Sequence, residues 1–293
     1  MTDDLGLDRG ERIPMKVKVV TDSTSDLPRE VAAELGITVV PAQVQYGNEV
    51  YRDGVDLDTD EFYRRLRTSS SLPKTSPASV ATFKEIYQGL SREGESIISI
   101  HVAAKLSATY DAARLASADL SLPIVLIDSQ TASMACGLLA IIAAKAAQSG
   151  ASLEEVEALV RQAVPYTITF GVFGTLEYLA RGGRIGKGQA FVGNLLRIHP
   201  ILAIRGGEVV PIERVRTRSK AVERMCQIVE SLGLPREMAV LHTTDPQEAE
   251  RLAQRLSSIF PLERMYRASI GPSMGTQVGP DALGMALITE KLV

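Results

Sequence analysis

TLEYLARGGRIGKGQAFVGNLLRIHPIL, residues 175–202, is the segment that says most about the fold and the site of this chain. It joins two helical patterns through the glycine-punctuated run RGGRIG at residues 181–186. Adjacent glycines remove side chains where the backbone must turn, which leaves Arg184 free to point inward at an anionic group. An arginine on a tight turn can bind a carboxylate or a phosphate through two parallel hydrogen bonds.

The length of the chain, 293 residues, exceeds that of a usual single domain. We expect a flexible tail over residues 1–14, an N-terminal α/β domain over 15–165 and a C-terminal α/β domain over 166–293. The net charge of −3 argues against a nucleic-acid-binding protein, which normally carries a basic surplus. A DNA-binding regulator is therefore disfavoured.

The cysteines and the apolar runs indicate a cytoplasmic protein. Cys136 and Cys226 lie far apart in apolar helical patterns, which is typical of buried structural thiols. The longest apolar run, residues 134–147, is too short to span a membrane, and the acidic N-terminus does not resemble a signal peptide. No Cys, His and Asp cluster predicts a metal site, and we expect no cofactor.

Strand and helix patterns alternate through the first half, which predicts a parallel sheet with helices on both faces. The predicted strands are residues 16–21, 37–40, 96–102 and 123–128, with a hairpin at 43–50 and a loop at 68–79. Ligands bind beyond the carboxyl ends of such strands. Residues 22–25, Ser107, Asp128 and Ser129 all fall at these ends.

The second half is predicted to form a mixed or antiparallel sheet with helices. It begins with the strand ITFGVF, continues through a hairpin around Gly206 and Gly207, and ends in strand pieces around a glycine-rich turn within residues 264–288. Apolar residues at 170–202 and 270–288 could line a pocket or pack in an ordinary core.

Two hydroxyl-rich loops allow two interpretations. KTSPAS holds Thr75, Ser76 and Ser79, and KLSATY holds Ser107 and Thr109. Such hydroxyls commonly cap helices and turns. They could instead converge on one oxygen-bearing ligand, because a hydroxyl donates to a carboxylate without carrying charge.

Other chemistries find less support. Ser107 does not lie in a GxSxG motif, and the histidines His101, His199 and His242 show no spacing that identifies a base, so a hydrolase or transferase is the weaker alternative. The chain has no GxxxxGK[ST], and its first loop, DSTSDLP, lacks glycine, which disfavours nucleotide binding.

The acidic and basic clusters also allow a structural and a functional interpretation. The carboxylates Asp22, Asp26 and Asp128 are more typical of helix and turn caps than of a magnesium site. In the basic cluster we expect Arg184 to point inward, with Arg181 and Lys187 pointing outward.

Taken together, the motifs resemble those of the DegV family of bacterial fatty-acid-binding proteins. The resemblance covers nearly the whole chain from Val17 onward, and its order and spacing are specific. The segments that carry it are VTDSTSDLP (20–28), KTSPAS (74–79), LSATY (106–110), IDSQTAS (127–133), LEYLARGGRIG (176–186), HPIL (199–202) and IGPSMGTQVGPDALG (270–284).

The resemblance implies one long-chain fatty acid buried between two α/β domains. It places the carboxylate on Thr75 and Ser107, with Arg184 at the same head group. Ser76 and Thr109, from the same two loops, are expected at this site as well. Gln277 stands where the family normally has a histidine, and a glutamine can donate a hydrogen bond but cannot carry a proton near neutral pH.

The resemblance also implies a carrier without catalytic residues, active in phospholipid metabolism. Its partner would be a fatty acid kinase of the dihydroxyacetone-kinase-like type, which makes an acyl phosphate. We expect a monomer without stable membrane insertion. Possible docking residues for the kinase are Arg181, Lys187, Arg214 and Arg216.

Overall fold

The computed structural model describes residues 16–69, 71–91, 95–190 and 198–290. The predicted tail at 1–14 and part of the second helical pattern after Gly186 lie outside these residues. The described part is a mixed α/β fold in which a parallel sheet and a mixed sheet are both flanked by helices. No helix among the described residues is both long and apolar enough to cross a bilayer.

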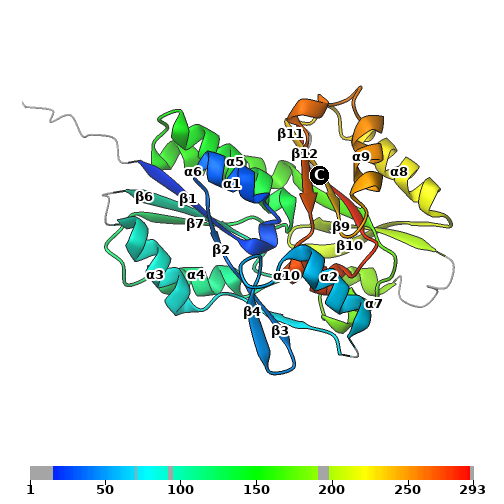
Figure 1. The fold of residues 1–293 in the computed structure, drawn as a ribbon. Coiled ribbons are helices and arrows are strands. Elements are labelled where there is room, and N and C mark those ends of the chain that lie inside the picture. Colours follow the sequence, from blue (N-terminus) through cyan, green and yellow to red (C-terminus); the bar gives the residue numbers. More distant parts are fainter. Residues whose placement is uncertain (1–15, 70, 92–94, 191–197, 291–293) are drawn as a thin grey trace, which may run out of the picture.

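The first half forms a four-stranded parallel sheet in the order β2-β1-β6-β7, as predicted. Its strands are β1 (Val17–Asp22), β2 (Thr38–Val40), β6 (Ser96–His101) and β7 (Ile124–Asp128). Every residue of β6 is buried, because helices cover both faces of the sheet. Figure 1 shows α1 (Arg29–Leu35), α5 (Met134–Gln148) and α6 (Leu153–Ala163) on one face, with α3 (Val80–Ser91) and α4 (Thr109–Ser117) on the other.

The second half forms a six-stranded mixed sheet in the order β10-β9-β8-β13-β11-β12. All its pairings are antiparallel except that of β11 with β12. The strands are β8 (Thr167–Val172), β9 (His199–Arg205), β10 (Glu208–Val215), β11 (Glu237–His242), β12 (Tyr266–Ser269) and β13 (Leu283–Ile288). The helices of this half include α7 (Glu177–Arg181), α8 (Arg218–Ser231) and α9 (Pro246–Arg255).

Helix α5 lies between the two sheets and contacts β1 and β6 on one side and β8, β11 and β13 on the other. Its sequence, MACGLLAIIAAKAAQ, is apolar on all sides over most of its length, as expected for a helix buried all round. One apolar core therefore includes residues of both halves, such as Val19, Leu138 and Ala286. The division into domains at residue 165 stays a prediction.

A third, small sheet in the order β4-β3-β5 corrects one expectation. Its strands are β3 (Gln43–Tyr46), β4 (Glu49–Arg52) and β5 (Lys74–Ser76). Strand β5 lies in the segment 68–79 that was predicted to be a loop. Its backbone is extended because it pairs with β3, and Ser76 precedes a proline, which disfavours the helical region.

The predicted glycine-rich turn contains the helix α10 (Pro272–Val278). Pro272 suits its first turn, and its carbonyl end is closed by Gly279 at φ 71°. Helix α10 packs on α2 (Thr59–Thr68) through Gly275, where a β-carbon would come within 2.6 Å of the Phe62 ring.

Local signals in the sequence account for several element ends. Gly36 ends α1 at φ 65°, and Asp58 caps α2 by accepting the N–H of Glu61 at 2.8 Å. Gly206 and Gly207 both have positive φ and turn the hairpin between β9 and β10.

Both cysteines are buried and unpaired, as predicted. Burial raises the pKa of the Cys136 thiol to about 12, so this thiol stays protonated and unreactive. Cys226 packs in the core between α8 and the six-stranded sheet.

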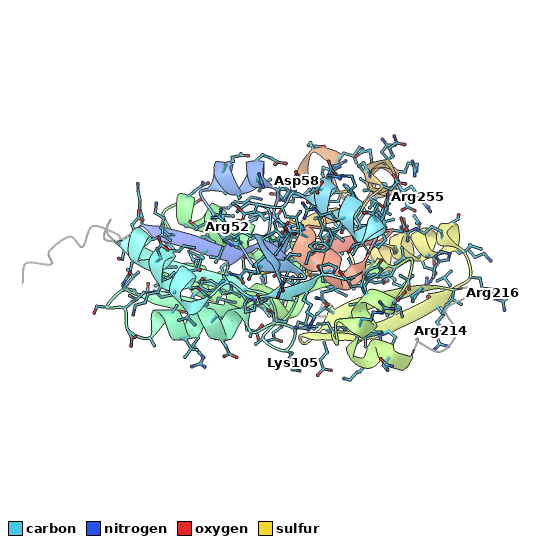
Figure 2. All side chains as sticks on the ribbon, turned by 60° about the horizontal axis from the view of Figure 1, so that its bottom comes forward. Arg52, Asp58, Lys105, Arg214, Arg216 and Arg255 are labelled. Carbon is cyan, nitrogen blue, oxygen red and sulfur yellow. The ribbon has the colours of Figure 1, made fainter. Side chains whose placement is uncertain are left out.

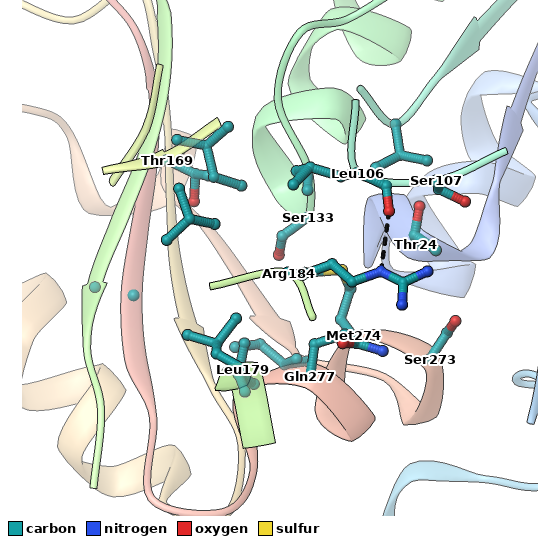
Figure 3. Close-up of a pocket in the computed structure, with 18 of the residues that line it drawn as sticks. Thr24, Leu106, Ser107, Ser133, Thr169, Leu179, Arg184, Ser273, Met274 and Gln277 are labelled. Carbon is teal, nitrogen blue, oxygen red and sulfur yellow. Dashed lines mark hydrogen bonds between the residues drawn. The ribbon is translucent and has the colours of Figure 1, made fainter. Parts of the chain in front are cut away.

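The basic side chains proposed for docking do not form one cluster. Figure 2 shows Arg214 and Arg216 toward the outer end of β10. Nearer the junction of the two halves, Arg181 pairs with Glu177 at 2.6 Å, and Lys187 pairs with Glu208 at 2.9 Å.

Candidate ligand-binding site

A cavity lies between the carboxyl ends of the parallel strands and the inner face of the six-stranded sheet, with α7 and α10 beside it. About 1210 Å³ in and around it holds no protein atom, part of this space being open to solvent. Its wall includes six residues that the sequence nominated for a ligand: Thr75, Ser76, Ser107, Thr109, Arg184 and Gln277. Ser79, from the same loop as Thr75, is not part of this wall and accepts the N–H of Thr82 at 3.0 Å. The position matches that of a small-molecule site in an α/β protein.

Most of the wall is apolar. Strands β8, β9 and β13 contribute much of this part, together with residues next to α7, and its members include Phe170, Phe173, Leu179, Leu202, Ile204 and Leu283. Gly171 of β8 and Gly284 of β13 are direct partners in the sheet and also line the cavity. A β-carbon on Gly171 would come within 2.7 Å of the Leu283 carbonyl oxygen, so the close approach of the two backbones here requires glycine. The sequence analysis missed this pair, whose strand-interior glycines were the available signal.

Thr75 and Gln277 meet at the polar part of the wall, although they come from β5 and α10. The Gln277 Nε2 donates to Thr75 Oγ1 at 3.2 Å. The Gln277 Oε1 is buried, and no hydrogen-bond partner for it occurs among the described residues. This pair leaves the second N–H of the Gln277 amide and the hydroxyl proton of Thr75 available to a ligand.

Ser107 and Thr109 lie together at the start of α4. Their hydroxyl oxygens are 2.8 Å apart, and Ser107 Oγ also accepts the backbone N–H of Thr109 at 3.3 Å. The two interpretations of this loop therefore coexist, because the hydroxyls order the helix start and also face the cavity. Ser76 is exposed and donates to Gln43 Oε1 at 3.2 Å, so its hydroxyl is engaged on the small sheet.

Arg184 reaches from the glycine turn to the loop before α4. Its Nε donates to the carbonyl of Leu106 at 3.2 Å and its Nη1 to that of Gly182 at 2.6 Å. The side chain remains exposed, so it lies at the mouth of the cavity and is not enclosed within it. Gly183 and Gly186 supply the positive φ values of this turn, 71° and 51°.

Besides Thr169 of β8, three further polar residues line the cavity and were not nominated: Thr24, Ser133 and Ser273. They come from the segments DSTSDLP, IDSQTAS and IGPSMG, which the sequence analysis had placed at strand ends or in the family resemblance. Thr24 donates its hydroxyl to Asp22 Oδ1, and Ser133 donates to Asp26 Oδ2 at 2.5 Å. The N–H of Ser273 donates to Asp53 Oδ2 at 3.2 Å.

A buried chain of hydrogen-bonded side chains lies behind Thr24. It does not bring a nucleophile to the cavity. His101 Nδ1 lies 2.8 Å from Asp22 Oδ2, and its Nε2 lies 2.7 Å from Ser99 Oγ, which in turn contacts Tyr87. His101 and Ser99 are fully buried, as expected for a packed histidine. Ser107 pairs with Thr109, and no described histidine forms a hydrogen bond with it.

Asp22, Asp26 and Asp128, the acidic residues considered for a metal, each accept hydrogen bonds from other residues. Asp128 accepts the N–H groups of Gln130 and Ala104, at 2.9 and 3.3 Å, and so orders the loop after β7. Among the described residues, no group of three or more His, Cys, Asp or Glu side chains could hold a metal ion.

A family model described as "Uncharacterised protein, DegV family" matches residues 16–290. The chain belongs to the DegV family. One relative is Protein DegV of Bacillus subtilis, which is 33% identical over 283 residues, covering 92% of this chain and 98% of that protein.

Solved structures of DegV-family proteins share the fold. A fatty-acid-binding DegV-family protein from Thermus thermophilus is 31% identical, with a TM-score of 0.87 over 94% of this chain and 100% of that one. A stearic-acid-binding protein from Eubacterium ventriosum is 25% identical, with a TM-score of 0.85 over 94% and 98% of the two chains.

Proposed function

We propose that this DegV-family protein binds one long-chain fatty acid in the cavity, with the acyl chain against the apolar wall and the carboxylate at Thr75, Ser107, Arg184 and Gln277. The observation that carries the proposal is the division of one cavity into an apolar part and a hydroxyl-rich part with an arginine at its mouth. The fatty-acid ligands named for its structural relatives support the same conclusion.

The acyl chain and the carboxylate contribute differently to the binding free energy. Burying an acyl chain contributes roughly 0.8 kcal/mol per methylene, so about 15 methylenes give a gross term near 12 kcal/mol. Hydrogen bonds to a charged group add about 1.5–3 kcal/mol each. The tail therefore supplies most of the affinity, and the polar residues fix where the carboxylate lies.

In this proposal the protein is a carrier that presents the carboxylate to a fatty acid kinase of the dihydroxyacetone-kinase-like type for acyl phosphate formation. A shallow groove shares Leu106, Ser107 and Arg184 with the cavity and continues outward to Lys105 and Glu208. The carboxylate would be reached through this groove. The carrier would act as a cytoplasmic monomer, with the basic residues near the groove contacting the kinase.

Mass spectrometry of the purified protein, first native and then after solvent extraction, tests the proposal. We expect one fatty acid per chain, and a lower occupancy in Thr75→Ala and Arg184→Ala variants that keep the wild-type melting temperature. Arg255→Ala, at the end of α9 and outside the cavity wall, is a matched surface control. A protein that is purified empty and takes up no added fatty acid would contradict the proposal.

A further inference from the structure

Asp26 lies behind the polar part of the cavity wall, between the cavity and a second hollow on the other side. It follows the short helical turn after β1 and is 7% exposed. Asp26 lines the second hollow together with Ser23 and Asp53. Ser133, which binds Asp26 Oδ2, lines the cavity. A proton can therefore reach Asp26 from the second hollow without passing the ligand.

The hydrogen bonds of Asp26 define what Ser133 offers to a ligand. The N–H of Gly271 donates to Asp26 Oδ1 at 2.8 Å, so Oδ2 is the oxygen left to carry a proton. When Asp26 is ionised, Ser133 must donate to it and turns only lone pairs toward the cavity. When Asp26 is protonated, it can donate to Ser133, whose own proton is then free to bind a carboxylate.

The backbone of Ser133 is strained in this position. Ser133 adopts φ 56° and ψ −152°, a combination that non-glycine residues rarely take. Its N–H donates to the carbonyl of Thr24 at 2.9 Å, and it begins α5 without a side-chain cap because its hydroxyl is used by Asp26. The strained conformation thus places one hydroxyl between the cavity and a buried carboxyl group.

The groups around Asp26 make a second negative charge unfavourable there. Asp22 faces it from the end of β1 and Asp53 from the segment after β4, while Tyr63 faces it from α2. Arg29, at the start of α1, lowers the pKa of Asp53, and Arg267, which pairs with Glu250 at 3.0 Å, also lines the second hollow. The contacts from α5 and α10 are Ser133 and the Gly271 N–H, and neither titrates.

Burial is the main cause that raises the pKa of Asp26 well above the usual aspartate value, and Asp53 and Asp22 raise it further. The hydrogen bonds from Ser133 and Gly271 oppose this shift. An anionic ligand on the other side of Ser133 adds another like charge and favours the protonated acid still more.

We propose that Asp26 takes up one proton from solvent when a carboxylate enters the cavity, and that Ser133 then reverses its hydrogen bond and donates to that carboxylate. This inference rests on the proposed function, because the ligand is taken to be a fatty acid. The only bond formed is the O–H bond at Asp26 Oδ2, and the proton comes from water or buffer in the second hollow. Asp26 is thus a positioning residue that acts through Ser133.

The test measures fatty-acid affinity between about pH 6.5 and 9.5, where the free carboxylic acid is already ionised. For the wild type, affinity falls with rising pH by up to about tenfold per pH unit in the range where Asp26 must be protonated to accept the ligand. A long-chain alcohol of equal length, which brings no charge, shows no such fall. Calorimetry in two buffers of different ionisation enthalpy reports the proton uptake directly.

Asp26→Asn is the decisive variant, because its amide can donate to Ser133 at every pH. It binds the fatty acid without the pH dependence, whereas Asp111→Asn, an exposed carboxylate on α4, keeps the wild-type dependence. Ser133→Ala lowers the affinity at low pH and flattens the profile.

Each contrary result has its own meaning. Fatty-acid binding without proton uptake in the wild type, or an unchanged slope in Asp26→Asn, would overturn the inference and leave the proposed function intact. Absence of fatty-acid binding at every pH would overturn both. If Asp26→Asn does not fold, the two-buffer measurement on the wild type still decides.

Discussion

The side-chain oxygen of Gln277 occupies the space that a β-carbon on residue 182 would need, so Gly182 and Gln277 fit together only because residue 182 is glycine. Gly182 itself has an ordinary helical φ of −70°. Of the adjacent glycines in RGGRIG, Gly183 therefore serves the turn, and Gly182 serves the packing of α10 against α7. This contact also holds Gln277 against Thr75.

Gly182→Ala is expected to displace the Gln277 amide and break its hydrogen bond to Thr75. Loss of one such bond, worth about 0.5–1.5 kcal/mol, weakens fatty-acid binding by roughly 2- to 12-fold. A fluorescence competition assay measures this affinity. Gly89→Ala in α3 is the matched control, because no atom lies within 4 Å of its added β-carbon, and it should leave binding unchanged. Equal affinities for both variants would argue against the packing role of Gly182.

Arg184→Ala removes the cation at the mouth of the cavity. We expect affinity for a fatty acid to fall by about tenfold or more, and affinity for the alcohol of equal length to fall much less. Arg181→Ala serves as the control, since this neighbouring arginine is exposed and pairs with Glu177. A similar loss for acid and alcohol would show that Arg184 acts by packing and not by charge.

Ser107→Ala separates holding the ligand from presenting it. Fatty-acid affinity should fall modestly, by roughly 2- to 10-fold, because the other head-group residues remain. The rate of acyl phosphate formation with a partner kinase, measured at saturating fatty acid, should fall further than the affinity does. Ser117→Ala, at the other end of α4, gives the baseline. Phosphorylation that stays at the wild-type rate would remove Ser107 from this role.

The buried carboxyl group of Asp53 should make the stability of the folded protein depend on pH. Burial raises its pKa to about 7, although Ser23 and the Ser273 N–H donate to it. The folded state therefore favours the protonated acid, and stability falls as pH rises from the unfolded value near 4 to about 7. Thermal melting between pH 4 and 8 should show this fall, reduced in Asp53→Asn.

A suitable control for that measurement is Asp56→Asn. Hydrogen bonds from Arg52 lower the pKa of exposed Asp56 to about 2, so this group does not titrate in the same range. If Asp53→Asn and Asp56→Asn melt with the same pH profile as the wild type, Asp53 does not set the pH dependence.

The large elements of the fold could be predicted from the sequence because their patterns are local. Alternating strands and helices, the glycine after α1 and the aspartate before α2 each act within a few residues. Strand β5 and helix α10 could not, because β5 exists only through its pairing with β3, and the short, glycine-containing α10 depends on packing against α2 and α7.

The site was predictable to a different extent. Apart from Ser79, the residues nominated from the hydroxyl loops, the glycine turn and the family resemblance line one cavity, and their roles in binding remain proposals. The involvement of Ser133 could not be foreseen, because it depends on a hydrogen bond to Asp26, 107 positions away in the chain. Nor does the sequence show that Ser76 turns toward Gln43, which requires the small sheet to be in place.

The position of helix α5 between the two sheets has a consequence for how the protein unfolds. Its two sides are covered by different sheets, so a fragment that ends near residue 165 would leave one apolar side in water. If either half unfolds, it exposes one apolar side of α5. Because the other half packs on the same helix, it is destabilised as well. Heating should melt the whole molecule in one cooperative step, and separately expressed halves should aggregate unless they are refolded together.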